Sequence, residues 1–360
     1  MKKLLAILAV LVLAVSPILA NSIGTGIGVD IETEDFVPEI WMCDGRAVYD
    51  DNIEPGRNGA PSLSERLNNY AFEGEQLEYD VLVLDKNGIN KIEDVYMTIG
   101  TSQGTGNDIE VNCVLNELGP EVDSSCNAYI GEEKVEAKNF DNWNQIAAMY
   151  TCTLTVETPE SMYGEYWVTA EVTDLDGLQN SVDENEYWFF NPVIALTVEG
   201  ELAFENVRPG TNSYSETLLV GNDADEGSGV TLDMYISGTN FYDSSSSGAM
   251  CPTSNVLELD NFAYYAVNGA YTTATVSGVN PAWDPDDEGY VGIPEGNTIN
   301  QAKEIVGTEF FGDAGSSYNN WRGNTLTPGA EMALTFRLAL PEPCNGDFDT
   351  GTIYFWGEAI

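Results

Sequence analysis

Apolar and polar residues alternate with a period of two along most of this chain, and this pattern predicts β-strands. Six runs show it most clearly: Leu77 to Val83, Val95 to Ile99, Tyr150 to Val156, Tyr166 to Val172, Val230 to Ile236 and Met332 to Leu340. Each run would present one apolar face and one polar face, as a sheet packed on one side requires. We therefore expect an all-β fold made of two packed β-sandwich domains.

Turn residues separate these runs. Four clusters contain residues that favour turns, because glycine and asparagine tolerate a positive φ and proline fixes φ at a value suited to a turn. They are Lys86-Asn87-Gly88, Asp176-Gly177, Pro209-Gly210 and Pro328-Gly329. The best helical candidate is the segment from Gln301 to Val306. We expect it to form one surface turn of helix on a β scaffold.

The chain is long for a single hydrophobic core, because domains usually contain about 100 to 200 residues. The aromatic run from Tyr187 to Phe190 would end one sandwich, and Val193 to Val198 would open the next. We therefore place a boundary near Asn191-Pro192. The expected division is a signal peptide at 1–20, a first sandwich at 21–190 and a second at 191–360.

The first twenty residues read as a secretory signal. Lys2 and Lys3 precede an apolar run from Leu4 to Val15, and a small residue, Ala20, marks the expected cleavage site. No later segment approaches the roughly 20 apolar residues that a membrane-spanning helix needs. We expect a secreted protein, extracellular or at the cell surface, with no transmembrane segment after the signal is removed.

The charge balance limits the classes of partner that the chain can be expected to bind. The sequence has 59 acidic and 13 basic residues and a formal net charge of -46. Nucleic acids and anionic membranes would repel such a chain, so neither is expected as a partner. Two interpretations stay open: a surface adapted to high salt, or one that collects divalent cations.

Six cysteines in an exported chain favour disulfides. A nested arrangement by sequence position predicts Cys113 with Cys126, Cys43 with Cys152, and Cys251 with Cys344. Six cysteines allow fifteen connectivities, so this pairing is a hypothesis.

The first half resembles the immunoglobulin-like domains of prokaryotic, archaeal-type surface proteins. The matching residues are Gly74-Glu75 before the strand from Leu77 to Leu84, Asp85 to Gly88 at its turn, and the run from Gly164 to Gly177. The second half is similar in style to surface-layer and filament proteins, and more weakly to jelly-roll subunits of matrix fibres, through Phe204 to Asn222. The resemblance implies an immunoglobulin-like sandwich followed by a second sandwich or a jelly roll.

Catalysis is not expected. The sequence has no histidine, which removes Ser-His-Asp and Cys-His catalysis as well as His-ligated metals. Paired carboxylates, as in glycoside hydrolysis, remain conceivable, but nothing in the sequence singles out one pair.

One segment has the layout of a twelve-residue calcium loop. Counted from Asp284, acidic residues occupy positions 1, 3, 5 and 12, with glycine at position 6, and the candidate ligands are Asp284, Asp286, Glu288, Tyr290 and Glu295. Pro294 prevents a helix from continuing through the end of this loop, so it is no helix-loop-helix hand. A solvated acidic turn is the alternative.

Two shorter turns also resemble calcium sites: Asp85-Lys86-Asn87-Gly88 and Asp174-Leu175-Asp176-Gly177. Such turns form between strands without an ion. Two aromatic groups could instead bind a glycan or simply fill the core: Tyr264, Tyr265, Tyr271 and Trp283, and the run from Tyr187 to Phe190.

These observations favour a non-catalytic structural protein of an envelope layer or extracellular filament. Its partners would be further copies of the chain or other surface proteins, and Asn21 to Asp30 could add a strand to a neighbour's sheet. The alternative is a monomeric adhesin or carbohydrate-binding module with a glycan ligand. A carboxylate-based hydrolase is the third hypothesis, and calcium is the only cofactor suggested.

Overall fold

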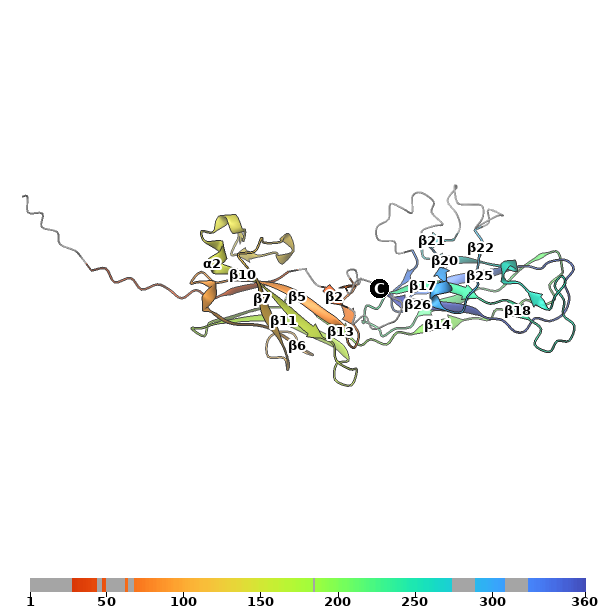
Figure 1. Ribbon diagram of the computed structural model, residues 1–360, viewed down its shortest axis with the longest axis horizontal. Coiled ribbons are helices and arrows are strands. Elements are labelled where there is room, and N and C mark those ends of the chain that lie inside the picture. The colour runs from red at the N-terminus through yellow and green to blue at the C-terminus, as the bar shows by residue number, and fades with distance from the viewer. Residues whose placement is uncertain are drawn as a thin grey trace, which may run out of the picture. The chain divides into compact units, whose positions relative to one another are not determined.

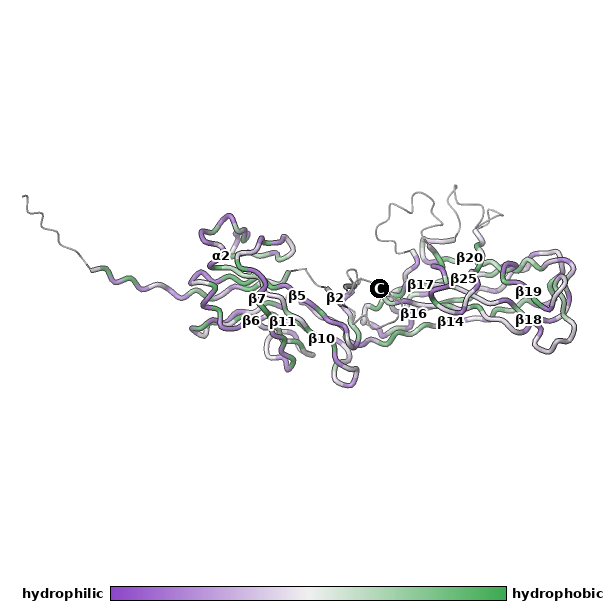
Figure 2. Tube along the Cα trace, viewed as in Figure 1, coloured by the Kyte–Doolittle hydropathy of each residue, from purple (hydrophilic) through white to green (hydrophobic). Residues whose placement is uncertain are grey.

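The protein is all-β in the computed structural model, which describes residues 28–43, 47–49, 62–63, 68–183, 185–273, 289–307 and 323–360. Its strands fall into two groups, coloured orange to green and green to blue in Figure 1. Figure 2 shows hydrophobic and hydrophilic residues alternating along them. This alternation confirms the fold class that the sequence predicts.

The first group forms one eleven-stranded sheet in the described part of the chain. Its strands run in the order β3-β2-β5-β10-β7-β6-β11-β13-β4, with β1 beside β5 and β12 beside β11. Their bounds are β1 (Glu39–Met42), β2 (Ala47–Tyr49), β3 (Ser62–Leu63), β4 (Tyr70–Ala71), β5 (Gln76–Leu84), β6 (Ile92–Gly100), β7 (Ile109–Leu118), β10 (Ala147–Thr155), β11 (Gly164–Asp174), β12 (Gln179–Val182) and β13 (Tyr187–Phe190).

This sheet curls so that its two halves enclose one core. Buried residues of β5 and β10 pack in the same cluster as buried residues of β6 and β11. Tyr79 on β5 meets Trp188 on β13 edge to face, with ring centroids 6.1 Å apart. The apolar positions of the alternating runs are the positions that face inward, because successive strand residues point to opposite faces.

The second group forms two main sheets that pack face to face. One has the order β14-β16-β25-β20-β21, joined by β15 and β22, and the other has the order β23-β17-β24, joined by β26. Their bounds are β14 (Leu196–Glu199), β15 (Asn212–Tyr214), β16 (Leu218–Asn222), β17 (Leu232–Gly238), β20 (Phe262–Asn268), β21 (Tyr271–Thr272), β22 (Val291–Gly292), β23 (Lys303–Glu304), β24 (Thr325–Leu326), β25 (Glu331–Ala339) and β26 (Ile353–Ala359).

The core of the second group lies between these two sheets. Leu334 and Phe336 on β25 are fully buried against Met234 and Ile236 on β17. Burying each such side chain contributes about 1.5–3 kcal/mol. The sandwich therefore rests on the alternating runs that the sequence displays.

Short elements complete the described structure. They are the two-stranded pairs β8 (Tyr129–Ile130) with β9 (Glu133–Lys134) and β18 (Phe241–Tyr242) with β19 (Val256–Leu257), the helix α2 (Trp143–Ile146), and the 3-10 turns η1 (Ile89–Lys91), η2 (Ser124–Cys126), η3 (Ala137–Asn139), η4 (Leu259–Asn261) and η5 (Ile299–Gln301). The predicted helix at Gln301 to Val306 is wrong. Only Gln301 is helical there, and Lys303–Glu304 pair with β17 as β23.

Hydrogen bonds also join residues of the two strand groups within the unit from Val37 to Ile360. The Tyr70 hydroxyl donates to the Ile360 carbonyl at 2.6 Å, and the Tyr163 hydroxyl donates to Asp225 Oδ2 at 2.9 Å. The expected domain boundary near Asn191-Pro192 falls between β13 and β14 and stays a prediction.

The disulfides correct the expected pairing. The structure joins Cys43 to Cys126, Cys113 to Cys152 and Cys251 to Cys344. The last pair agrees with the sequence prediction, and the other two predicted pairs are wrong. Strand pairing explains the difference, because Cys113 on β7 lies directly opposite Cys152 on β10.

The residues that precede the first sheet form a unit of their own. Gly28 to Phe36 belong to a separate unit, contain no strand, and are mostly exposed. The signal region at 1–20 lies outside the described residues. No helix in the described part of the chain is long and apolar enough to span a membrane.

Removing one inward-facing leucine should test the packing of the first core. Leu77 on β5 is 1% exposed, so Leu77→Ala should lower the free energy of unfolding by about 2–5 kcal/mol. Leu118→Ala is the matched control, because Leu118 on β7 is 50% exposed, and it should change stability by about 0.5 kcal/mol or less. Urea unfolding of both variants checks this, and equal losses would contradict the assigned core.

Candidate functional site

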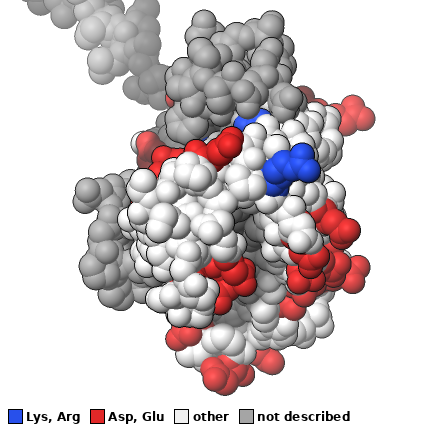
Figure 3. Space-filling model, turned by 90° about the vertical axis from the view of Figure 1, so that its right-hand side faces the viewer, with Lys and Arg blue, Asp and Glu red and all other residues white. Residues whose placement is uncertain are grey.

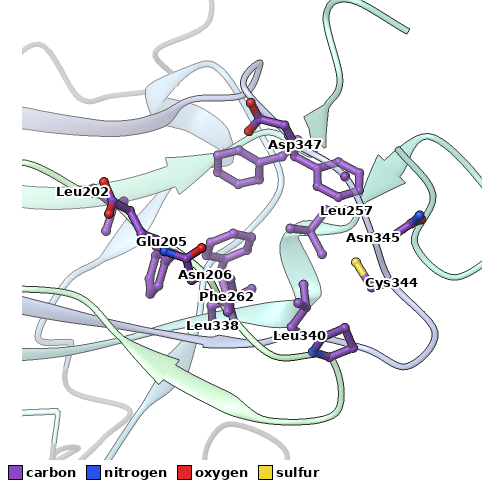
Figure 4. A pocket seen from close by; sticks show the side chains of 16 residues that line it. Leu202, Glu205, Asn206, Leu257, Phe262, Leu338, Leu340, Cys344, Asn345 and Asp347 are labelled. Carbon is purple, nitrogen blue, oxygen red and sulfur yellow. The ribbon is translucent and has the colours of Figure 1, made fainter. Parts of the chain in front are cut away.

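A cavity lies at the β18–β19 end of the second sandwich. It has a volume of about 800 Å³. Four parts of the chain line it: the segment after β14, the strands β18 and β19, the ends of β20 and β25, and the segment from Cys344 to Phe348. Figure 4 shows these side chains converging from different elements.

The floor of this cavity is the outer end of the hydrophobic core. Leu257, Phe262 and Leu338 line the cavity and are also buried members of the second core cluster. Phe204 and Phe241 are half-buried and pack against that cluster. The apolar interior of the sandwich therefore continues to the surface here.

Aromatic rings dominate the floor. The centroid of the Phe262 ring lies 4.6 Å from that of Phe241, with planes tilted by 31°, and 5.9 Å from that of Phe204, with planes at 71°. Phe348 adds a fourth ring to the lining. The rings interlock instead of forming one flat platform.

The rim of the cavity is polar and acidic. Glu205, Asn206, Asn345 and Asp347 line the cavity and are exposed. No lysine or arginine is among the described lining residues. Figure 3 looks at this end of the molecule and shows acidic groups scattered around a largely uncharged surface.

The segment from Cys344 to Phe348, which lines one side of the cavity, is fastened to a neighbouring loop that contains Met250 and Cys251. The disulfide between Cys251 and Cys344 joins them, and Met250 and Asn345 exchange main-chain hydrogen bonds of 2.9 and 3.0 Å. At Gly346, where φ is +104°, an added Cβ would collide with the main chain of Ala249. Only glycine fits this close approach.

Asp243 holds the shape of the loop that follows β18. Its buried carboxylate accepts hydrogen bonds from the main-chain N–H and the hydroxyl of both Ser245 and Ser247, at 2.6 to 2.9 Å, and from Ala249 N at 3.3 Å. The hydroxyl of Ser245, aided by the donors from Ser247 and Ala249, holds the pKa of Asp243 well below its usual range. The ionised carboxylate is therefore a structural part of this end of the sandwich.

The cavity is suited to binding. Its apolar floor can bury a hydrophobic group, and its amide and carboxylate rim can orient polar or cationic neighbours of that group. Among the described residues that line it, no nucleophile is paired with a base.

The predicted calcium loop is only partly described. Asp284, Asp286 and Glu288 lie outside the described residues. The ring of Tyr290 packs at a tilt against those of Tyr214 and Tyr265, at centroid distances of 5.6 and 5.8 Å. Glu295 Oε1 accepts a hydrogen bond from Asn240 at 3.4 Å. The described residues contain no group of three or more acidic, histidine or cysteine side chains placed to hold a metal. The calcium loop stays a prediction.

Three of the eight aromatic residues considered as a glycan platform belong to the core instead. Tyr264, Trp188 and Phe190 are buried, while Tyr187 and Tyr271 are 43% and 42% exposed. Trp283 lies outside the described residues. The core interpretation is therefore correct for the buried members of both groups.

The sequence analysis did not identify the cavity. Its four phenylalanines come from four separate segments, and only Phe204 belonged to a stretch singled out in the sequence. The turn at Pro209-Gly210 is the one sequence signal that points toward this cavity. Gly210 has φ +75°, and the turn brings the chain that follows Phe204 beside the end of β25. The partners of Phe204 depend on strand pairing, which spacing does not reveal.

Comparisons with known proteins give distant structural matches. No protein-family model matches the sequence, and no curated protein matches it. A structure described as BspA_C_WT has a TM-score of 0.31 at 12% identity, covering 88% of this chain and 96% of its own. The C-terminal domain of the AgI/II polypeptide BspA from Streptococcus agalactiae has a TM-score of 0.26 at 12% identity, covering 90% of this chain and 97% of its own.

A chaperone-tip adhesin complex of CFA/I fimbriae has a TM-score of 0.23 at 10% identity, covering 91% of this chain and 90% of its own. The chain is thus distantly similar to domains of bacterial surface adhesins. At these TM-scores the function has to be argued from the residues of the chain itself.

Replacing Asp243 should loosen this end of the sandwich in a pH-dependent way. The lowered pKa means that the ionised carboxylate stabilises the fold above its unfolded pKa of about 3.9, and that this stability is lost as pH falls through the folded pKa. Asp243→Asn should therefore lower the melting temperature at pH 7. As the pH falls below 4, the melting temperature of this variant should decrease less than that of the unmodified protein. Exposed Asp260→Asn is the control, and equal pH profiles for the two variants would contradict this role.

Proposed function

We propose that this protein is a secreted surface protein of adhesin type, which binds a partner protein through the cavity at the β18–β19 end and performs no catalysis. The observation that carries this proposal is the continuation of the hydrophobic core into an open, aromatic cavity with an acidic rim. Concave sites with an apolar lining and a few polar groups at the edge are the usual form of a binding site. The fastened loops around the cavity would keep it preformed.

The compartment supports this reading. All six cysteines are paired in the three disulfides of the structure. Disulfides persist in oxidising surroundings outside the cytoplasm. Together with the secretory signal expected at 1–20, they support the proposal of an exported chain.

The lining indicates the chemistry of the partner. Interlocked phenylalanine rings offer a hollow for an inserted apolar side chain, whereas sugar binding favours flat and exposed aromatic faces. Glu205 and Asp347 at the rim would attract lysine or arginine on either side of that side chain. The expected ligand is therefore a partner segment with one bulky apolar residue flanked by basic residues.

The structural component of an envelope layer or filament is the second candidate function. The exposed, strand-free residues from Gly28 to Phe36 favour it, because an extended segment of this kind can join a neighbour's sheet. In that case the partner is another copy of the chain. Electron microscopy of the mature protein at low and high salt would show sheets or fibres if this is the function.

A random peptide library displayed on phage tests the binding proposal. Peptides selected on the mature protein should share a Phe, Trp, Leu or Ile next to Lys or Arg. Val207→Glu, which puts a charge on the cavity wall, should weaken binding of a selected peptide at least tenfold, which corresponds to about 1.4 kcal/mol.

The matched control makes the same change elsewhere. Val114 on β7 is 71% exposed, so Val114→Glu should leave the affinity unchanged. Asp347→Lys should shift the selection away from basic peptides. Selected peptides that bind both Glu variants equally, or a preference for glycans on an array, would refute the peptide-binding cavity.

A further inference from the structure

The two turns with a calcium-like sequence meet at one end of the first sandwich. The turn from Asp85 to Gly88 follows β5, and the turn from Asp174 to Gly177 follows β11. A main-chain hydrogen bond of 2.8 Å from Leu175 N to Lys91 O holds the two segments together. Residues nearly ninety positions apart are thereby brought to one place.

Both first aspartates are buried there. Asp85 is 0% exposed and Asp174 is 2% exposed. Asp85 Oδ1 accepts a hydrogen bond from Asn87 N at 2.7 Å, and Asp174 Oδ1 accepts from Asp176 N at 3.0 Å and Leu178 N at 2.7 Å. One oxygen of each carboxylate therefore shapes its own turn.

The second oxygen of Asp85 lacks this support. Asp85 Oδ2 is buried, and no described residue donates a hydrogen bond to it. A buried carboxylate oxygen without a partner costs free energy, because it has lost its hydration and gained nothing in return. Burial and the charge of Asp174 raise the pKa of Asp85, whereas the N–H groups of Asn87 and Gly88 and the charge of Lys91 lower it.

The nearby basic residue is already engaged. Lys91 Nζ lies 3.1 Å from Asp176 Oδ2, and both side chains are 41% exposed. Asp85 and Asp174 are then left as two negative charges without a paired side-chain cation among the described residues. One divalent cation would neutralise both carboxylates.

We propose that Asp85 and Asp174 bind one calcium ion at this end of the first sandwich. Calcium accepts irregular sets of six to eight oxygens, so main-chain carbonyls and water can complete a site with two carboxylates. A bound calcium ion would give the buried Oδ2 of Asp85 the partner that no described hydrogen-bond donor supplies. Magnesium, which demands a near-ideal octahedron, fits this irregular pair of turns less well.

Calcium-dependent melting of the full mature chain tests the proposal. At pH 7 and constant ionic strength, calcium at ten times its dissociation constant should raise the melting temperature by about 2–4 °C over the value in EDTA, and equal magnesium should raise it less. Asp85→Asn should abolish the calcium effect. In EDTA this variant should melt at or above the unmodified protein, because it removes an unsatisfied buried charge.

Two controls separate this site from others. Asp108→Asn removes one exposed acidic charge from the same sandwich and should keep the full calcium effect. Asp286→Ala with Glu295→Ala alters the other predicted loop and should also keep it. If that double variant loses the effect while Asp85→Asn retains it, calcium binds elsewhere and the proposal is wrong.

Isothermal titration of the unmodified protein keeps the proposal testable even if Asp85→Asn fails to fold. One saturable site, absent or at least tenfold weaker in Asp174→Asn, is the expected result. Only weak, unsaturable calcium uptake, as an acidic surface alone would give, would overturn it.

Discussion

The burial of apolar sheet faces against one another is the interaction on which the rest of this structure depends. In the first sandwich one curled sheet provides both faces, and Tyr79 meets Trp188 across the core. In the second sandwich two sheets provide them, and Phe336 and Met234 lie between the sheets. Turns and loops lie where the strands end. Both proposed sites lie at such ends.

The cavity of the second sandwich follows from this construction. Phe262 begins β20 and Leu338 lies near the end of β25, so these residues are the outermost layer of the core. Beyond them the chain continues as loops, which are fastened by the disulfide between Cys251 and Cys344 and by the carboxylate of Asp243. A rigid frame therefore surrounds an apolar surface that the protein leaves open. The proposed calcium site lies in the other sandwich and does not depend on the cavity.

Much of the fold could be predicted from the sequence because a period of two is a local property. The runs around Val81, Val168 and Phe336 each became a long strand with the expected face buried. Pairing between strands is not local, which is why Cys113 was matched with Cys126 instead of with Cys152, its neighbour across β7 and β10. The helix predicted from Gln301 to Val306 is wrong for a related reason. Pairing of this segment with β17 outweighed its weak helical pattern.

The sites were harder to predict for the same reason. Phe204, Phe241, Phe262 and Phe348 share no motif, and only the folded sandwich gathers them. The sequence shows Asp85 and Asp174 as members of two separate turns, and their proximity depends on the fold. Both sites are thus products of tertiary structure, even though each residue in them is ordinary in its local sequence.

The most direct test of the central claim is amide hydrogen exchange of the mature protein with and without a selected peptide. The proposed binding mode predicts added protection in residues 202–209 and 344–348, which line the cavity, with little change in the first sandwich. Protection confined to the first sandwich, or to residues 28–36, would contradict a binding cavity at the β18–β19 end.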